Sequence, residues 1–103
     1  MAFLVKINAA ATVDEIIAAV NDYLNVWREV LRRIPEDCLP SKVADAESVL
    51  RAASALEEHR RQLVDSNLSV GHELNMATEF VTAAANKIRR LAGTQARVDR
   101  SEA

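Results

Sequence analysis

The residues of this 103-residue chain that could do chemistry are few and far apart in sequence. Metal sites in helical bundles use inward-facing Glu-x-x-His units, but Leu56 and Ser69 stand three residues before His59 and His72. The segment HELNM, which starts at His72, begins like a zinc-peptidase helix but has Met76 where the second histidine is required. We therefore expect no metal site and no cofactor.

The single cysteine, Cys38, follows Glu36 and Asp37 directly. Neighbouring carboxylates raise the pKa of a thiol, which disfavours the thiolate that nucleophilic catalysis needs. Two glycines in the whole chain are also too few for a phosphate-binding loop or a nucleophile elbow. The sequence therefore leans toward a non-catalytic protein, and one cysteine excludes an internal disulfide.

Two polar residues, Arg60 and Asn67, fall in an otherwise apolar heptad seam. Polar seam residues usually specify register or partner number at a cost in stability. In an antiparallel pair of helices Arg60 would lie near Asp14, which we predict as its carboxylate partner. An Arg60 without such a partner would point to a small-molecule binding or enzymatic pocket instead.

The elements that must position these residues are helices. Half of the residues are apolar and 4% are aromatic, and with two glycines and two prolines this composition is typical of an all-α protein. The segment TVDE places Thr12 as an N-cap three residues before Glu15, the spacing of a capping box. Apolar residues then recur at steps of three and four, which predicts a helix over 13–34 that stops before Pro35.

The second half of the chain carries two interleaved apolar seams that repeat every seven residues. Their phase is kept across DSNLSVGHELN (residues 65–75), which favours one long helix 42–92, packed with helix 13–34 in a dimeric coiled coil or four-helix-type bundle. The Ser, Asn and Gly residues of the same segment favour caps and turns. We therefore predict a reversal there, which gives helices 42–66 and 70–92.

Three helices of similar length cover one another's apolar faces within one chain. The predicted fold is an up-down-up three-helix bundle, with Ser41 as the N-cap of its second helix. The predicted core residues are Leu24, Trp27, Leu31, Leu56, Leu63, Leu74, Val81 and Ile88.

The ends of the chain differ from its middle. Residues 2–7, AFLVKI, alternate apolar residues like a short strand, so we predict an extended arm that packs over the bundle or is exchanged with a second subunit. With this arm included, the chain forms one helical domain, 1–92, followed by a polar tail, 93–103, that we predict to be disordered. The candidate interface residues come from the arm and from the third helix: Phe3, Val5, Ile7, Val70, Leu74 and Phe80.

Basic residues gather at one end of such a bundle, because its first and third helices would be parallel. The six that form this possible anion or nucleic-acid patch are Arg28, Arg32, Arg33, Lys87, Arg89 and Arg90. Helix dipoles favour bases near helix ends, so a solvated surface explains much of the pattern.

The first functional hypothesis is a non-catalytic helical-bundle protein that acts through helix-face contacts with another helical protein or with itself, as a homodimer. The second is a small helical nucleic-acid-binding or regulatory module that uses the arginine-rich end. The third is the pocket around Arg60. A net charge of −2 gives no general attraction to nucleic acid or membranes, and no apolar run is long enough to span a bilayer. We therefore expect no membrane contact and a cytoplasmic location.

Overall fold

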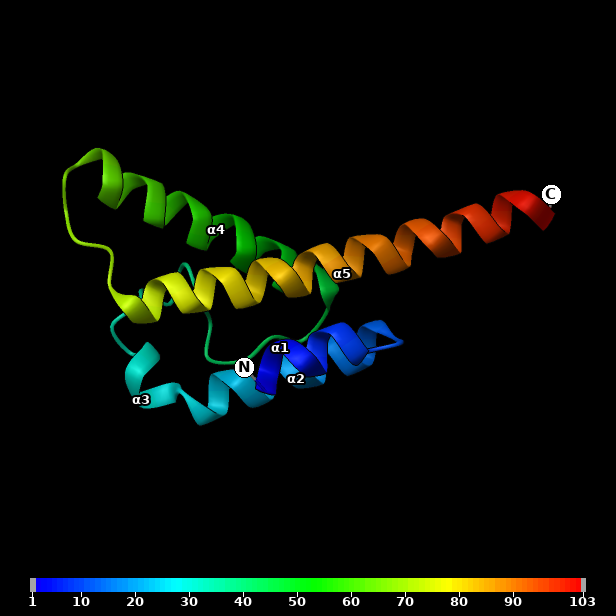
Figure 1. Ribbon diagram of the computed structural model, residues 1–103, viewed down its shortest axis with the longest axis horizontal. Helices are drawn as coiled ribbons and strands as arrows, with labels where there is room; N and C mark the ends of the chain where they lie inside the picture. Colours follow the sequence, from blue (N-terminus) through cyan, green and yellow to red (C-terminus); the bar gives the residue numbers. More distant parts are fainter. Residues whose placement is uncertain (1, 103) are drawn as a thin grey trace.

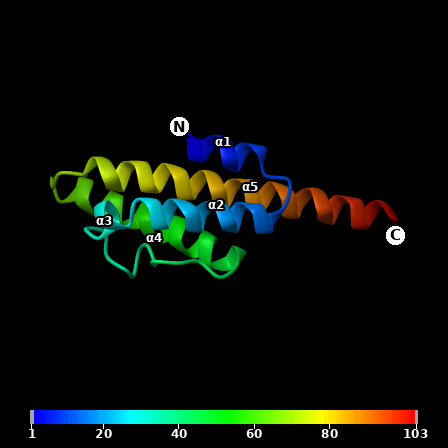
Figure 2. The same ribbon diagram turned by 90° about the horizontal axis from the view of Figure 1, so that it is seen from below.

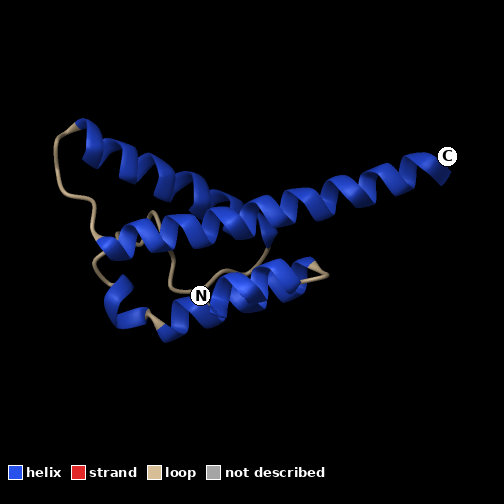
Figure 3. Ribbon diagram, in the orientation of Figure 1, coloured by secondary structure: helices blue, strands red, loops and turns tan. Residues whose placement is uncertain are grey.

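The computed structural model describes the backbone of residues 2–102 and the side chains of residues 3–93, and all of its regular elements are helical (Figure 1, Figure 3). The helices are α1 (Ala2–Ala9), α2 (Val13–Val26), α3 (Arg28–Leu31), α4 (Ala46–Asp65) and α5 (His72–Glu102). The all-α prediction is confirmed for this part of the chain.

Helix α5 is the centre of the fold and packs against α1, α2, α3 and α4. Helix α4 is antiparallel to α5, as the predicted hairpin requires. Helix α2 is antiparallel to α5 as well, because Tyr23 stacks on Phe80 while Arg33, later in the chain, pairs with Glu73, earlier in α5. Figure 2 shows the consequence, which is that α2 and α4 run in the same direction.

The up-down-up order is therefore wrong, and the connection between α3 and α4 explains why. Residues 32–45 do not form a tight turn but lead back along the bundle (Figure 1). Three of their side chains, Ile34, Leu39 and Val43, are buried in the core. The connection thus behaves as a packed layer, which a pattern of prolines and polar residues does not reveal.

Helix α4 begins four residues later than predicted, at Ala46, because Asp45 rather than Ser41 is its N-cap. The Asp45 carboxylate accepts hydrogen bonds of 2.8 Å from the backbone N–H and from the hydroxyl of Ser48. Before it, the side-chain amide of Asn21 in α2 bonds to both backbone groups of Val43, at 2.9 and 2.8 Å. This clamp satisfies the backbone of a buried residue in an extended segment.

The predicted reversal after α4 is confirmed, and the alternative of one helix over 42–92 is wrong. Asn67 has a left-handed φ of 58°. The N–H of Leu68 donates to the carbonyl of Leu63 at 2.8 Å, and the N–H of Asn67 donates to that of Val64 at 3.1 Å. These two bonds form a Schellman motif, in which Asn is one of the few residues that tolerate the left-handed position.

The N-terminal arm is helical, not extended as predicted. Phe3 and Ile7 are four residues apart, so α1 presents them on one face against α2 and α5, and Ile7 is fully buried. Phe3 stands edge-on to Tyr23 and Phe80, with ring centroids 5.4 and 6.1 Å away. Val5, which the strand pattern places on the same face, is 64% exposed.

The predicted helix 13–34 is divided at Trp27, whose backbone (φ −100°, ψ 14°) separates α2 from α3. Thr12 is confirmed as the N-cap at its start, since its hydroxyl accepts from the N–H of Glu15 at 3.2 Å. The Glu15 carboxylate accepts from the N–H of Ala11 at 3.1 Å, one residue before the N–H of Thr12 that a capping box uses. The break turns Trp27 outward, so its prediction as a core residue is wrong. Leu63 is partly buried, and the other six predicted core residues are buried.

Helix α5 does not end before Gly93 but continues to Glu102, through the segment predicted as a disordered tail. One glycine inside a helix costs about 1 kcal/mol, which favourable neighbours can offset. Figure 1 shows the last part of α5 projecting past the other helices.

Candidate functional site

The most pronounced apolar feature of the described surface lies where α2 meets α3. Three apolar side chains are exposed there: Val26 has 63% of its surface exposed, Trp27 38% and Val30 43%. Beside them is a cavity of about 290 Å³ between α2–α3 and the start of α5, lined by Tyr23, Trp27, Val30, Leu31, His72, Glu73 and Met76. We call Val26, Trp27, Val30 and this cavity the Trp27 surface.

At the break that creates this surface, both backbone groups of Trp27 stay hydrogen-bonded. The N–H of Trp27 donates to the carbonyl of Tyr23 at 3.0 Å, and the Trp27 carbonyl accepts from Leu31 at 2.9 Å. The Tyr23 ring stacks on Phe80 with centroids 4.3 Å apart, which fixes the inner wall of the cavity. Burial raises the pKa of the Tyr23 hydroxyl, so that it stays neutral.

Charged groups of both signs border the Trp27 surface. A second cavity of about 310 Å³ shares Val30 and Glu73 with the first and adds Glu29 and Arg33. Arg33 lies 3.9 Å from the carboxylate of Glu73, and Arg32 lies 3.3 Å from that of Glu29. An apolar centre with a charged rim is the usual composition of a protein-binding surface.

The chemistry available at this surface is binding. It has no nucleophile paired with a base, and within the described residues no three His, Cys, Asp or Glu side chains come together as metal ligands. Burial, followed by the charge of Asp37, raises the pKa of the Cys38 thiol and keeps it protonated. None of the described helices is both long and apolar enough to cross a membrane.

Most of the predicted interface residues are buried in, or packed against, the core of their own chain. Ile7, Leu74 and Phe80 are buried, and Phe3 and Val70 are partly buried against them. Only Val5 is strongly exposed. The arm that the sequence left open either to pack over the bundle or to be exchanged with a second subunit packs, as α1, on α2 and α5 of its own chain.

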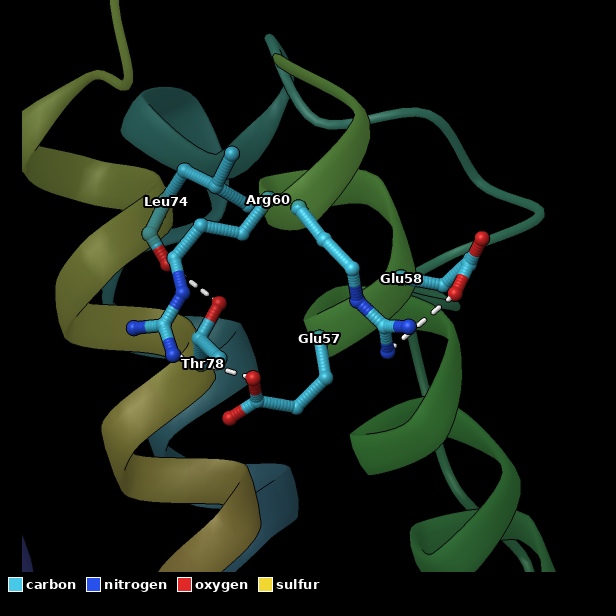
Figure 4. A network of polar contacts seen from close by, with 6 residues as sticks. Glu57, Glu58, Arg60, Leu74 and Thr78 are labelled. Atoms are coloured by element: carbon cyan, nitrogen blue, oxygen red, sulfur yellow. Dashed lines mark hydrogen bonds and ion pairs between the residues drawn. The ribbon is translucent and has the colours of Figure 1, made fainter. Parts of the chain in front are cut away.

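The polar seam residues also have other partners than predicted. Arg60 bonds to Glu57 on its own helix at 2.9 Å, and Figure 4 shows this pair together with the Thr78 hydroxyl, which donates to the carbonyl of Leu74 at 2.7 Å. Asp14 is exposed at the start of α2, and because α2 and α4 are parallel it lies at the opposite end from Arg60. Its predicted pairing with Arg60 is wrong, and Asn67 is a helix cap.

The six basic residues do not gather at one end. Arg28, Arg32 and Arg33 lie on or beside α3, next to the start of α5, whereas Lys87, Arg89 and Arg90 lie far along α5. The fourteen residues from Glu73 to Lys87 span roughly 21 Å of helix. The predicted common patch is wrong because it depended on parallel first and third helices.

Sequence reasoning missed Val26 and the outward turn of Trp27. Val26 lies outside the apolar stripe of helix 13–34, which is the one signal that it faces away from the core. Asn21 gave no signal, because its partner Val43 is 22 residues away in sequence.

Comparison with known proteins gives no similarity that bears on this site. No family model matches the chain, and neither curated proteins nor solved structures give a match.

Proposed function

We propose that this chain is a non-catalytic helical-bundle protein that acts through protein–protein contact and pairs with a second copy of itself through the Trp27 surface. The observation that carries the proposal is an exposed tryptophan beside an apolar cavity, where most other large apolar side chains of the described residues are buried. Tryptophan is the residue type most enriched among the side chains that dominate binding energy at interfaces.

The form of the surface favours a second copy over an unrelated partner. In a two-fold dimer the same patch meets itself, so it must hold both members of each contact. The Trp27 surface has protruding valines next to a cavity, and Arg28, Arg32 and Arg33 next to Glu29 and Glu73. Turning one copy by 180° against another can therefore place valine against cavity and arginine against glutamate.

The exposed apolar area is small, which sets the expected strength. Three partly exposed side chains make a patch near the lower limit of interface size, where association is transient. We expect dissociation constants in the micromolar to millimolar range, roughly −4 to −8 kcal/mol.

Sedimentation velocity over a wide range of protein concentration tests the proposal, and Trp27 is the only tryptophan of the chain and reports directly on the contact. We expect the sedimentation coefficient to rise with concentration while the Trp27 emission shifts to shorter wavelength. Val26→Asp, which leaves the reporter in place, should abolish both changes. Val5→Asp introduces the same charge at an equally exposed valine of α1 and should abolish neither.

A monomer at every concentration would reject pairing with a second copy. Equal loss in both variants would show that net charge, and not the Trp27 surface, drives association. If a different helical protein binds the wild-type chain but not Val26→Asp, the Trp27 surface is a binding surface but its partner is not a second copy.

A further inference from the structure

Three cations of α5 differ from most other basic side chains of the protein. Within residues 3–93, six basic side chains have a carboxylate at 3.9 Å or less: Lys6, Arg32, Arg33, Arg51, Arg60 and Arg61. Lys87, Arg89 and Arg90 have no such partner among the described side chains, although they are close together on one helix. Like charges at this spacing repel each other unless something compensates them.

Two of these cations border a hollow where the end of α1 lies against α5. The hollow has a volume of about 560 Å³ and is lined by Asn8, Ala83, Asn86, Arg89 and Arg90. Its lining contains no carboxylate, whereas four other cavities among the described residues each include at least one glutamate. The hollow therefore offers two guanidinium groups and no negative charge among its lining residues.

Hydrogen bonds hold this hollow in shape. The Nζ atom of Lys87 donates to the carbonyl of Asn8 at 3.1 Å and so ties the last turn of α1 to α5. The Nη1 atom of Arg89 donates to the side-chain oxygen of Asn86 at 3.0 Å, which orients one guanidinium along the rim. Arg90 and Asn8 also line the hollow, and their guanidinium and amide groups can both donate hydrogen bonds.

The helix dipole does not account for these charges. A dipole favours basic residues in the last turn of a helix. Because α5 continues to Glu102, Lys87, Arg89 and Arg90 lie about three to four turns before its end.

We propose that the hollow between α1 and α5 binds a phosphate group, with the guanidinium groups of Arg89 and Arg90 as its principal ligands and the amides of Asn8 and Asn86 beside them. Guanidinium forks match the oxygens of phosphate in geometry and charge. This site lies along α5 from the Trp27 surface and does not depend on it. The phosphate can belong to a small molecule or to a nucleic-acid backbone.

Two double variants of equal charge test the proposal in the full chain. Arg89→Gln with Arg90→Gln removes the hollow's guanidinium groups. Lys42→Gln with Arg51→Gln removes the same charge from two cations that line another cavity, away from both the hollow and the Trp27 surface. Sodium phosphate is titrated at low ionic strength and followed by backbone amide chemical shifts, and a fluorescent oligothymidylate of about ten nucleotides is followed by anisotropy.

We expect saturable shifts at Asn8, Ala83 and Asn86, a loss of affinity of about tenfold or more in Arg89→Gln with Arg90→Gln, and a loss of less than about threefold in the control. Tighter binding of the oligonucleotide, with a slope of log affinity against log salt of about −1.4, as expected for two phosphates neutralised on a single strand, assigns the phosphate to nucleic acid. Saturation by phosphate with no gain from the oligonucleotide assigns it to a small ligand. Shifts that do not saturate, or that fall equally in both double variants, overturn the proposal.

Discussion

The α4–α5 hairpin and the N-terminal half of the protein, residues 3–45, are specified in different ways. The hairpin follows from local sequence: each helix has an apolar seam, which in α4 is interrupted by Arg60, and Asn67 ends α4 in a conformation that few residues accept. The N-terminal half depends on partners far away in the chain. Phe3 is fixed by Tyr23 and Phe80, and the connection to α4 is fixed by Asn21.

Because of this difference, we expect substitutions in the two halves to change the free energy of unfolding by different amounts. In the hairpin, single local substitutions at the cap should have modest effects, because two long helices share many contacts. In the N-terminal half, a few side chains decide whether α1 and the connection are placed at all. The predictions below compare the two halves, beginning with the contact that joins them.

The largest effect is expected at Phe80, which is fully buried and carries the aromatic contacts of α1 and α2 on α5. Phe80→Ala should lower the free energy of unfolding by about 3 to 5 kcal/mol, measured by urea denaturation. Phe3→Ala, at the partly buried edge of the cluster, should cost less. Phe80→Leu, which keeps most of the volume, provides a folded variant if the alanine variant does not fold. Equal costs at Phe3 and Phe80 would contradict a cluster centred on α5.

The second prediction concerns the clamp between Asn21 and Val43. Asn21→Leu removes both hydrogen bonds and leaves the backbone groups of a buried residue without partners, so we expect a loss of about 2 kcal/mol. The amide of Val43 should exchange with solvent faster, as seen by hydrogen exchange. Asn25→Ala, at an exposed position of the same helix, should change neither quantity. A protected Val43 amide in Asn21→Leu would show that the connection is held by its apolar side chains alone.

The turn of the hairpin should respond less. Asn67→Ala keeps a Cβ atom at a left-handed residue but removes the local hydrogen bonding by which Asn tolerates that conformation, and should cost about 1 kcal/mol. Asn67→Gly should be as stable as the parent or slightly more stable, because glycine is the preferred residue at this position. Both values come from denaturant unfolding. A glycine variant less stable than the alanine variant would be incompatible with the left-handed φ.

The smallest effect is expected at the exposed N-cap of α4. Hydrogen bonds from the backbone N–H of Ser48 and then from its hydroxyl lower the pKa of Asp45 in the folded state. A lowered pKa stabilises the fold above the ordinary value of about 3.9, and that contribution is lost as the pH falls through the folded pKa. Unfolding curves of the parent and Asp45→Asn should therefore converge at acid pH. If the difference in stability between the two proteins does not narrow at acid pH, the charge of the Asp45 carboxylate does not contribute to that difference.

The sequence by itself determined the helical class, the cap at Thr12, the reversal around Asn67 and the buried seams of α4 and α5. Each of these rests on residues within a few positions of one another, whose propensities and periodicity act locally. Tertiary structure alone decided the helical state of α1, the parallel course of α2 and α4, the outward turn of Trp27 and the separation of the two groups of arginines. Those features depend on pairs such as Phe3 with Phe80 and Asn21 with Val43. A one-dimensional pattern shows which side chains must be buried, but only the folded chain settles which partners bury them, because that choice is made by packing between segments that the sequence keeps apart.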